Sequence, residues 1–168
     1  KTTKLKEMYI VRYADDFKIF CRYRSDANKI FIAVKQWLSE RLKLQISEEK
    51  SKVINLKKNY SEFLGFKLKA VKKSKKYAVR CHMSDDAVKR ETQKLIKQVK
   101  IIQRPADYKE EYKSISRYNS MVIGIHNYYQ IATNINLDCS KIGRQITTIT
   151  ENRLWQRMKK TSNEQEAI

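Results

Sequence analysis

The chain has few of the residues that mark disulfide-rich, zinc-binding or low-complexity proteins. Its 168 residues include three cysteines, three glycines and one proline. The cysteines, Cys21, Cys81 and Cys139, are far apart and show no C-x-x-C spacing, so neither a disulfide framework nor a zinc site is predicted. His82 and His126 are too isolated to indicate a metal cluster. A reducing compartment fits this composition best.

Long apolar runs are also missing. No run approaches the roughly 18 residues of a membrane span, and the start Lys1-Thr2-Thr3-Lys4 lacks the apolar region of a signal peptide. We therefore expect a protein without a membrane partner. Its expected location is the cytoplasm of a bacterium, with an organelle as the alternative.

Acidic residues are outnumbered by basic ones. There are 18 Asp and Glu against 37 Lys and Arg, which gives a net charge of +19. Such a charge is typical of proteins that bind a phosphate backbone, so nucleic acid is the first candidate partner. An anionic membrane surface is the competing interpretation, but the basic residues form no single amphipathic helix. The 41% hydrophobic content suffices for the core of one domain or two small ones.

Two alternating apolar runs meet at a pair of adjacent carboxylates near the start of the chain. A period of two is the strand signature, so the sequence predicts a β-hairpin with Ala14-Asp15-Asp16 as its turn. At a tight turn both carboxylates can lean towards one point and hold hard divalent cations through oxygen. A two-metal phosphoryl-transfer site requires this arrangement, with cations roughly 4 Å apart. The alternating apolar positions are Tyr9, Val11 and Tyr13, then Phe17, Ile19 and Cys21.

Tyr13-Ala14-Asp15-Asp16 between apolar strands resembles the catalytic hairpin of reverse transcriptases, and further blocks resemble group II intron-encoded reverse transcriptase/maturases. The resemblance implies that Asp15 ligates catalytic Mg²⁺ ions and that Asp16 ligates or assists one of them. It also places Tyr13 against nucleic acid. The alternative is an acidic hairpin turn exposed to water, as in most Asp-Asp pairs of arbitrary proteins.

The segment after the hairpin predicts a helix capped by Ser25, a polar turn that carries Lys50, and a strand over Val53 to Leu56. In the resembled family a lysine here approaches the nucleoside triphosphate and protonates the departing pyrophosphate, which would be the role of Lys50. A solvated surface lysine is the alternative, and Ser51 and Arg41 depart from the family pattern. The helix carries apolar residues on one face, namely Ile30, Val34, Trp37, Leu38 and Leu42.

Phe63-Leu64-Gly65-Phe66 resembles the primer grip of the same family, a hairpin that steadies the primer 3′ end. A glycine within an apolar strand marks a bulge or a close approach of another backbone. The return strand is expected over Tyr77 to Met83, with the intervening turn facing nucleic acid. The alternative is a core strand with a solvated tip. The lysines of the turn are Lys72, Lys73, Lys75 and Lys76.

The pattern changes after Met83, where Ser84 is the expected N-cap of a helix. Arg104-Pro105 breaks this helix, and Asp107 can cap the next. A third helix follows, so the sequence predicts a small helical bundle. The apolar or aromatic positions at helical spacing are Val88, Leu95, Ile96, Val99 and Ile102 in the first helix; Tyr112, Ile115, Asn119, Val122, His126 and Tyr129 in the second; and Ile142, Ile146 and Ile149 in the third.

The second of these helices contains a block that resembles the thumb, or X domain, of group II intron maturases. It keeps Asn119, Gly124 and Asn127-Tyr128-Tyr129 but has isoleucines where the family has Arg and Trp. The resemblance makes Asn119, Asn127, Tyr128 and Tyr129 candidate nucleic-acid contacts, with a bundle core as the alternative for the tyrosines. Gly124 costs about 1 kcal/mol relative to Ala in a helix, which suggests close packing against a neighbouring helix or a nucleic-acid backbone.

Together these features predict an α+β fold. A partial polymerase palm, with an antiparallel sheet and a packed helix, spans residues 1–83; a three-helix thumb spans 84–160, and a frayed polar tail spans 161–168. The implied function is RNA-directed DNA synthesis by a group II intron reverse transcriptase, with a maturase role in splicing and mobility. The implied partners are intron RNA, an RNA template with a DNA primer, deoxynucleoside triphosphates and two Mg²⁺ ions.

The resembled family draws a further Asp and its fingers from sequence that precedes the hairpin. Residues 1–8 offer Glu7 as their only acid, so we expect this chain to be a fragment that does not extend a primer without an upstream half. The other functional class is a non-catalytic basic module that binds intron RNA and assists its folding.

Overall fold

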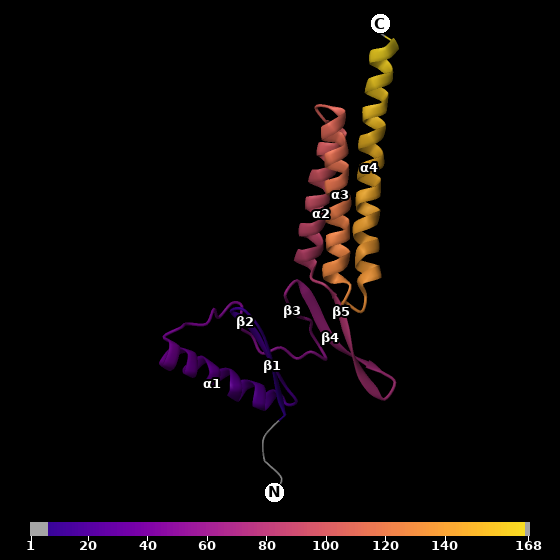
Figure 1. The fold of residues 1–168 in the computed structure, drawn as a ribbon. Helices are drawn as coiled ribbons and strands as arrows, with labels where there is room; N and C mark the ends of the chain where they lie inside the picture. Colours follow the sequence, from indigo (N-terminus) through magenta and orange to yellow (C-terminus); the bar gives the residue numbers. More distant parts are fainter. Residues whose placement is uncertain (1–6, 167–168) are drawn as a thin grey trace. The chain divides into compact units, whose positions relative to one another are not determined.

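The computed structural model describes residues 7–166, with side chains through residue 159, and has an α+β fold. The predicted fold class, antiparallel strands followed by helices, is confirmed. The chain divides into two compact units, Lys1–Asn55 and Leu56–Ile168 (Figure 1). Residues 1–4, on which the expectation about a signal peptide rests, lie outside the described residues.

The first unit contains a two-stranded antiparallel sheet and one helix. Strands β1 (Met8–Tyr13) and β2 (Asp16–Cys21) form the predicted hairpin. Tyr13 pairs with Asp16, so the turn consists of Ala14 and Asp15, and Asp16 is the first residue of β2. The turn is therefore one residue shorter than predicted.

Helix α1 (Arg24–Leu42) packs on β2 through one of its faces. Its N-cap is Tyr23, which has an extended backbone and no side-chain capping bond, so the predicted cap at Ser25 is wrong. The partly buried apolar positions of the helix include Ile30, Val34 and Leu38. Trp37 and Leu42, predicted on the same face, are 54% and 50% exposed.

Residues 43–55 connect the two units without regular strand structure. The predicted strand over Val53 to Leu56 is wrong, because none of the described strands supplies ladder hydrogen bonds to it. A single backbone hydrogen bond, from Ala70 N–H to the Leu56 carbonyl oxygen, joins the end of this segment to β4 (Phe66–Lys73). The polar turn that carries Lys50 is present at residues 48–50.

The second unit begins with a three-stranded antiparallel sheet in the order β3-β4-β5. Its strands are β3 (Ser61–Phe63), β4 (Phe66–Lys73) and β5 (Lys76–Met83). Two-residue turns, Leu64-Gly65 and Ser74-Lys75, join them. The predicted return strand is confirmed, but Gly65 lies in a turn between strands and not within one.

Three helices follow, α2 (Asp85–Gln103), α3 (Tyr108–Tyr129) and α4 (Ile135–Glu166), and they lie side by side (Figure 1). Both predicted caps are confirmed: the Ser84 side chain accepts from Ala87 N–H, and that of Asp107 from Glu110 N–H. Helix α4 continues to Glu166, so its backbone is helical through most of the expected tail. None of the described helices has the length and apolar content that a membrane crossing requires.

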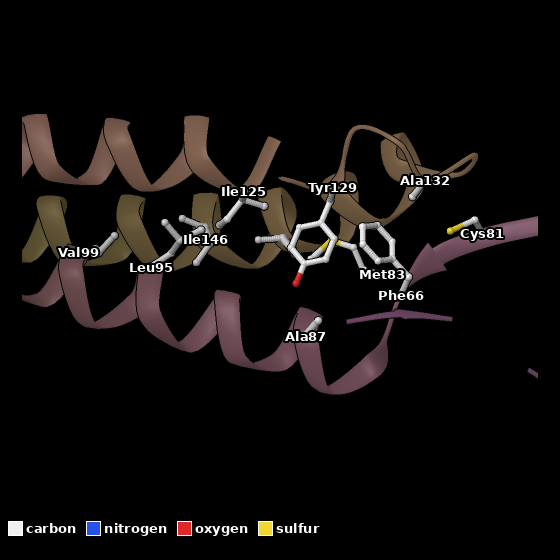
Figure 2. Close-up of a cluster of buried hydrophobic side chains, with 11 residues drawn as sticks. Phe66, Cys81, Met83, Ala87, Leu95, Val99, Ile125, Tyr129, Ala132 and Ile146 are labelled. Carbon is white, nitrogen blue, oxygen red and sulfur yellow. The ribbon is translucent and has the colours of Figure 1, made fainter. Parts of the chain in front are cut away.

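The core of the second unit lies where the helices meet the sheet (Figure 2). Its members include the predicted helix residues Leu95, Val99, Ile142 and Ile146. The fully buried residues of α3 are Ser114, Ile125 and Tyr129. Helical spacing is therefore confirmed for α3, but of its six predicted positions four are exposed, namely Tyr112, Ile115, Asn119 and His126.

Hydrogen bonds tie the end of β5 to the start of α4. Buried Asp138 accepts from Met83 N–H at 2.9 Å and lies 3.1 Å from His82 Nδ1. The Thr133 hydroxyl accepts from Cys81 N–H at 2.8 Å. These bonds join the sheet to the helices within the second compact unit.

Gly124 lies within α3, where an added Cβ would meet no atom within 4 Å. The predicted close packing of Gly124 against a neighbouring helix is therefore wrong. We expect Gly124→Ala to raise the free energy of unfolding by about 0.5–1 kcal/mol, because Ala loses less backbone entropy in a helix. Urea denaturation followed by circular dichroism measures this change, and Gly143→Ala in α4, equally open, is the matched variant. A loss of stability in Gly124→Ala alone would contradict the open environment.

Candidate functional site

The tip of the β1–β2 hairpin carries two adjacent carboxylates. Ala14 has a φ of 51°, a left-handed conformation that is uncommon for residues other than glycine. The Arg12 side chain holds this turn, because its Nε donates to the Ala14 carbonyl oxygen at 2.7 Å. A local contact thus stabilises the backbone conformation that presents Asp15.

Asp15 and Asp16 are both exposed to solvent. Asp16 lies directly opposite Tyr13, so these two side chains share a face of the hairpin, while Asp15 occupies the turn. Among the described residues no basic side chain forms an ion pair with either carboxylate. Nor do the described residues contain a group of three or more His, Cys, Asp or Glu that could hold a metal. The arrangement offers two free carboxylates to a cation that takes its other ligands elsewhere.

Lys50 lies in an exposed turn of the same unit. This turn is tied to α1 by an ion pair between Lys35 Nζ and Glu48 at 2.8 Å, and closed by the bond from Ser51 N–H to the Ser47 carbonyl. No hydrogen bond or ion pair within the described part of the chain joins Lys50 to the carboxylate hairpin.

A second left-handed turn lies at Leu64-Gly65, where both residues have positive φ, 52° and 79°. Two carbonyl oxygens of this turn accept hydrogen bonds from the helical part of the unit. The Tyr128 hydroxyl donates to the Leu64 carbonyl at 3.1 Å, and Ser84 N–H donates to that of Gly65 at 2.7 Å. The N-cap residue of α2 therefore also anchors the turn.

Aromatic rings complete this anchor. Phe66 stacks on Tyr128 with ring centroids 5.7 Å apart and contacts Tyr129 at 5.2 Å. Figure 2 shows the rings of Phe66 and Tyr129 beside Met83. The Tyr129 hydroxyl accepts from Arg90 Nη2 at 3.2 Å, and burial raises the pKa of this phenol, which keeps it neutral.

Two of the predicted nucleic-acid contacts are buried, as in the alternative interpretation of a core. Phe66 is 8% exposed and Tyr129 is 3% exposed, so both belong to the core and hold the Leu64-Gly65 turn from behind. Tyr128 is 55% exposed, and Asn119 and Asn127 are also exposed on α3. Phe63, Leu64 and Gly65 are partly buried at the turn itself.

The predicted lysine cluster is split between the two sides of the β4–β5 hairpin. Lys73 pairs directly with Lys76, so these two share a face, whereas Lys72 pairs with Tyr77 on the other. Lys75 occupies the turn, next to Ser74 with its φ of 56°. All four lysines are exposed.

Residues 1–68 match the family model described as reverse transcriptase (RNA-dependent DNA polymerase). The match supports a reverse transcriptase. It covers both the carboxylate hairpin and the Leu64-Gly65 turn, and it ends within β4. No curated protein matches the chain significantly.

Sequence reasoning missed the contacts that hold the two turns of the matched segment. Arg12 sits in an apolar strand, where its only signal is a charge at an otherwise apolar position. Arg90 and Tyr128 act on backbone or side chains that are distant along the chain, so no local pattern identifies these contacts.

We expect Gly65→Ala to lower the free energy of unfolding by about 1–3 kcal/mol. Its Cβ would stand 3.0 Å from the Tyr129 hydroxyl, on a backbone that L-residues rarely adopt. Thermal and urea unfolding measure the loss. Gly124→Ala, the same substitution at an open helical site, should change stability in the opposite direction. Equal effects at both sites would refute the anchored turn.

Proposed function

We propose that this chain supplies the palm hairpin and the thumb of a group II intron-encoded reverse transcriptase, which copies RNA into DNA and assists intron splicing and mobility. One observation carries the proposal: two exposed carboxylates, which form no ion pair with any described residue, stand at the tip of a hairpin within the matched residues. The Asn119 to Tyr129 block supports the finer assignment to group II introns by resemblance.

Asp15 and Asp16 fit a divalent cation with hard oxygen ligands, since both are exposed and free of ion pairs among the described residues. When bound, Mg²⁺ would stabilise the charge that develops on the attacking and leaving oxygens. Two carboxylates provide only some of the six oxygen ligands of Mg²⁺, so substrate phosphates and water would provide the others. In this proposal Lys50 approaches the triphosphate and donates a proton to the departing pyrophosphate.

The Leu64-Gly65 turn would position the primer in this proposal. A turn that must steady a DNA end has to keep its own shape, and here two carbonyl hydrogen bonds and two aromatic rings fix it. The proposed partners are an RNA template with its DNA primer, deoxynucleoside triphosphates, intron RNA and the fingers with the remaining palm acid. The proposed location is the cytoplasm.

A non-catalytic RNA-binding module is the second candidate. The observation that favours it is that the family match ends at residue 68, while exposed basic residues continue through α2, for example Lys97 and Lys100. The two candidates differ in what the carboxylates do, because RNA binding requires neither Asp15 nor Asp16.

We expect Asp15→Asn to reduce RNA-templated primer extension by about 100-fold or more, because a ligand that stabilises charge in the transition state is lost. The assay uses the chain alone, where we expect no extension, and the chain mixed with the fingers and palm acid of the resembled family. Glu49→Gln is the matched control, an exposed acid outside the hairpin. RNA affinity should be equal in all three proteins. Extension that survives Asp15→Asn would exclude the proposed role of Asp15 as a catalytic ligand. The absence of extension in every mixture would exclude polymerisation and leave the RNA-binding module.

We expect Mg²⁺ to bind the chain weakly in the absence of nucleotide, with half-saturation at about 1 mM or above, because two carboxylates provide too few ligands. Isothermal titration calorimetry at physiological salt measures this affinity. Adding a template–primer and nucleotide should tighten binding in the wild type and not in Asp15→Asn. Tight binding of Mg²⁺ by itself would contradict a site that is completed by substrate.

A further inference from the structure

The β4–β5 hairpin has two chemically different faces. Its register places Lys69 opposite Arg80 and Lys73 opposite Lys76. Because side chains alternate along a strand, these two pairs project to the same side. We call Lys69, Lys73, Lys76 and Arg80 the basic face. Between its pairs lies the small apolar pair Val71 and Ala78.

The opposite face differs in composition. It carries Leu68 opposite Cys81, Ala70 opposite Val79, and Lys72 opposite Tyr77. Near the helices this side joins the core through Cys81. The cations are thus concentrated on one face by the alternation of the strands, although the sequence around the turn is uniformly rich in lysine.

Like charges directly opposite one another destabilise a sheet. The basic face contains two such pairs, and no carboxylate of the described residues forms an ion pair with any of its four members. The nearby acid Asp85 is already engaged by Lys67 at 2.6 Å. Lys69 is steadied by the Tyr60 ring, 5.4 Å from its Nζ, which does not neutralise its charge. The hairpin keeps a repulsion that a bound polyanion would remove.

We propose that the basic face binds the phosphate backbone of an RNA·DNA duplex, with Lys69 and Arg80 forming one contact and Lys73 and Lys76 the other. The choice of a hybrid duplex rests on the proposed function; the charge pattern itself does not depend on it. The two pairs are four residues apart along β4, a distance of about 13 Å, which corresponds to about four nucleotides of one strand.

The side chains on this face favour a duplex over a single strand. Single strands are held largely by stacking of bases on aromatic rings. The aromatic ring nearest to the face, that of Tyr60, is covered by Lys67 and Lys69 and meets His82 edge-on. Val71 and Ala78 offer no ring at all. Contacts that use charge alone read the regular backbone of a duplex and are independent of base sequence.

The test compares two substitutions at adjacent positions of β5. Ala78→Glu places a carboxylate on the basic face, whereas Val79→Glu places the same charge on the other face; both residues are exposed. The probe is a 20-base-pair RNA·DNA hybrid, bound without metal or nucleotide and followed by fluorescence anisotropy. We expect Ala78→Glu to weaken binding roughly tenfold and Val79→Glu to weaken it much less. Equal losses would show an effect of net charge only and overturn the proposal.

A second variant measures the number of phosphate contacts. Lys69→Gln/Arg80→Gln should reduce the slope of log affinity against log salt by about 2, since each neutralised phosphate contributes about 0.9. Lys109→Gln/Lys113→Gln on α3, two exposed lysines, removes the same charge and should leave the slope nearly unchanged. The thermal midpoint of the first variant should be equal or higher, because a repulsive pair is removed. An unchanged slope would overturn the proposal.

Further probes separate this inference from the proposed function. If Ala78→Glu weakened binding to phosphatidylserine vesicles, or to a single-stranded RNA, more than binding to the hybrid, the face would have another occupant and the proposal would fail. Binding is measured without catalysis, so the two proposals can fail separately. If Ala78→Glu selectively weakens hybrid binding but no mixture extends a primer, the duplex-binding face is supported and the polymerase function is excluded. If hybrid binding is unchanged while primers are extended, only the duplex-binding face is excluded.

Discussion

The second unit depends on the left-handed backbone at Leu64-Gly65. A leucine in this conformation costs of order 1–3 kcal/mol, and such strain persists only where the surrounding structure over-determines it. Here the Tyr128 hydroxyl and Ser84 N–H hold the two turn carbonyls, each bond contributing about 0.5–1.5 kcal/mol. The stacked rings of Phe66 and Tyr128 add about as much again. These contacts together offset the strain, so the turn keeps its shape while the helices stay folded.

The two turns of the matched segment are held in different ways. Arg12 stabilises the turn at Ala14 from two residues away, so this hairpin is a locally determined element. Its surroundings are open, because no side chain in the described part of the first unit is buried. The turn at Leu64-Gly65 instead depends on residues of α2 and α3. A few neighbouring residues thus suffice to position the carboxylates. The second turn keeps its conformation only when the whole unit is folded.

The acidic and basic residues of the chain also have different surroundings in different places. A net charge of +19 predicts a polyanionic partner but not where it binds. Acids of the second unit are used where helices meet: Glu111 forms two short bonds with Arg157, which hold the pKa of this carboxyl below its ordinary value. Asp138 is buried against β5. On the β4–β5 hairpin Lys67 pairs with Asp85, whereas strand alternation collects four other cations on one face, and these form no ion pair with any described residue.

The sequence alone determined the features that arise from short-range physics. The alternation on both sides of Asp15 predicts the hairpin, because the period of two is a property of each strand. Ser84 and Asp107 mark helix starts, because the side chain of a cap bonds to a backbone N–H only three residues away. The expected strand at Val53 failed because an apolar run does not specify a partner strand. Tertiary structure decided the rest: Tyr128 reaches Leu64 across 64 residues, and the side of α3 that is buried depends on where α2 lies. No local pattern encodes such contacts, since they exist only after the helices have packed against the sheet.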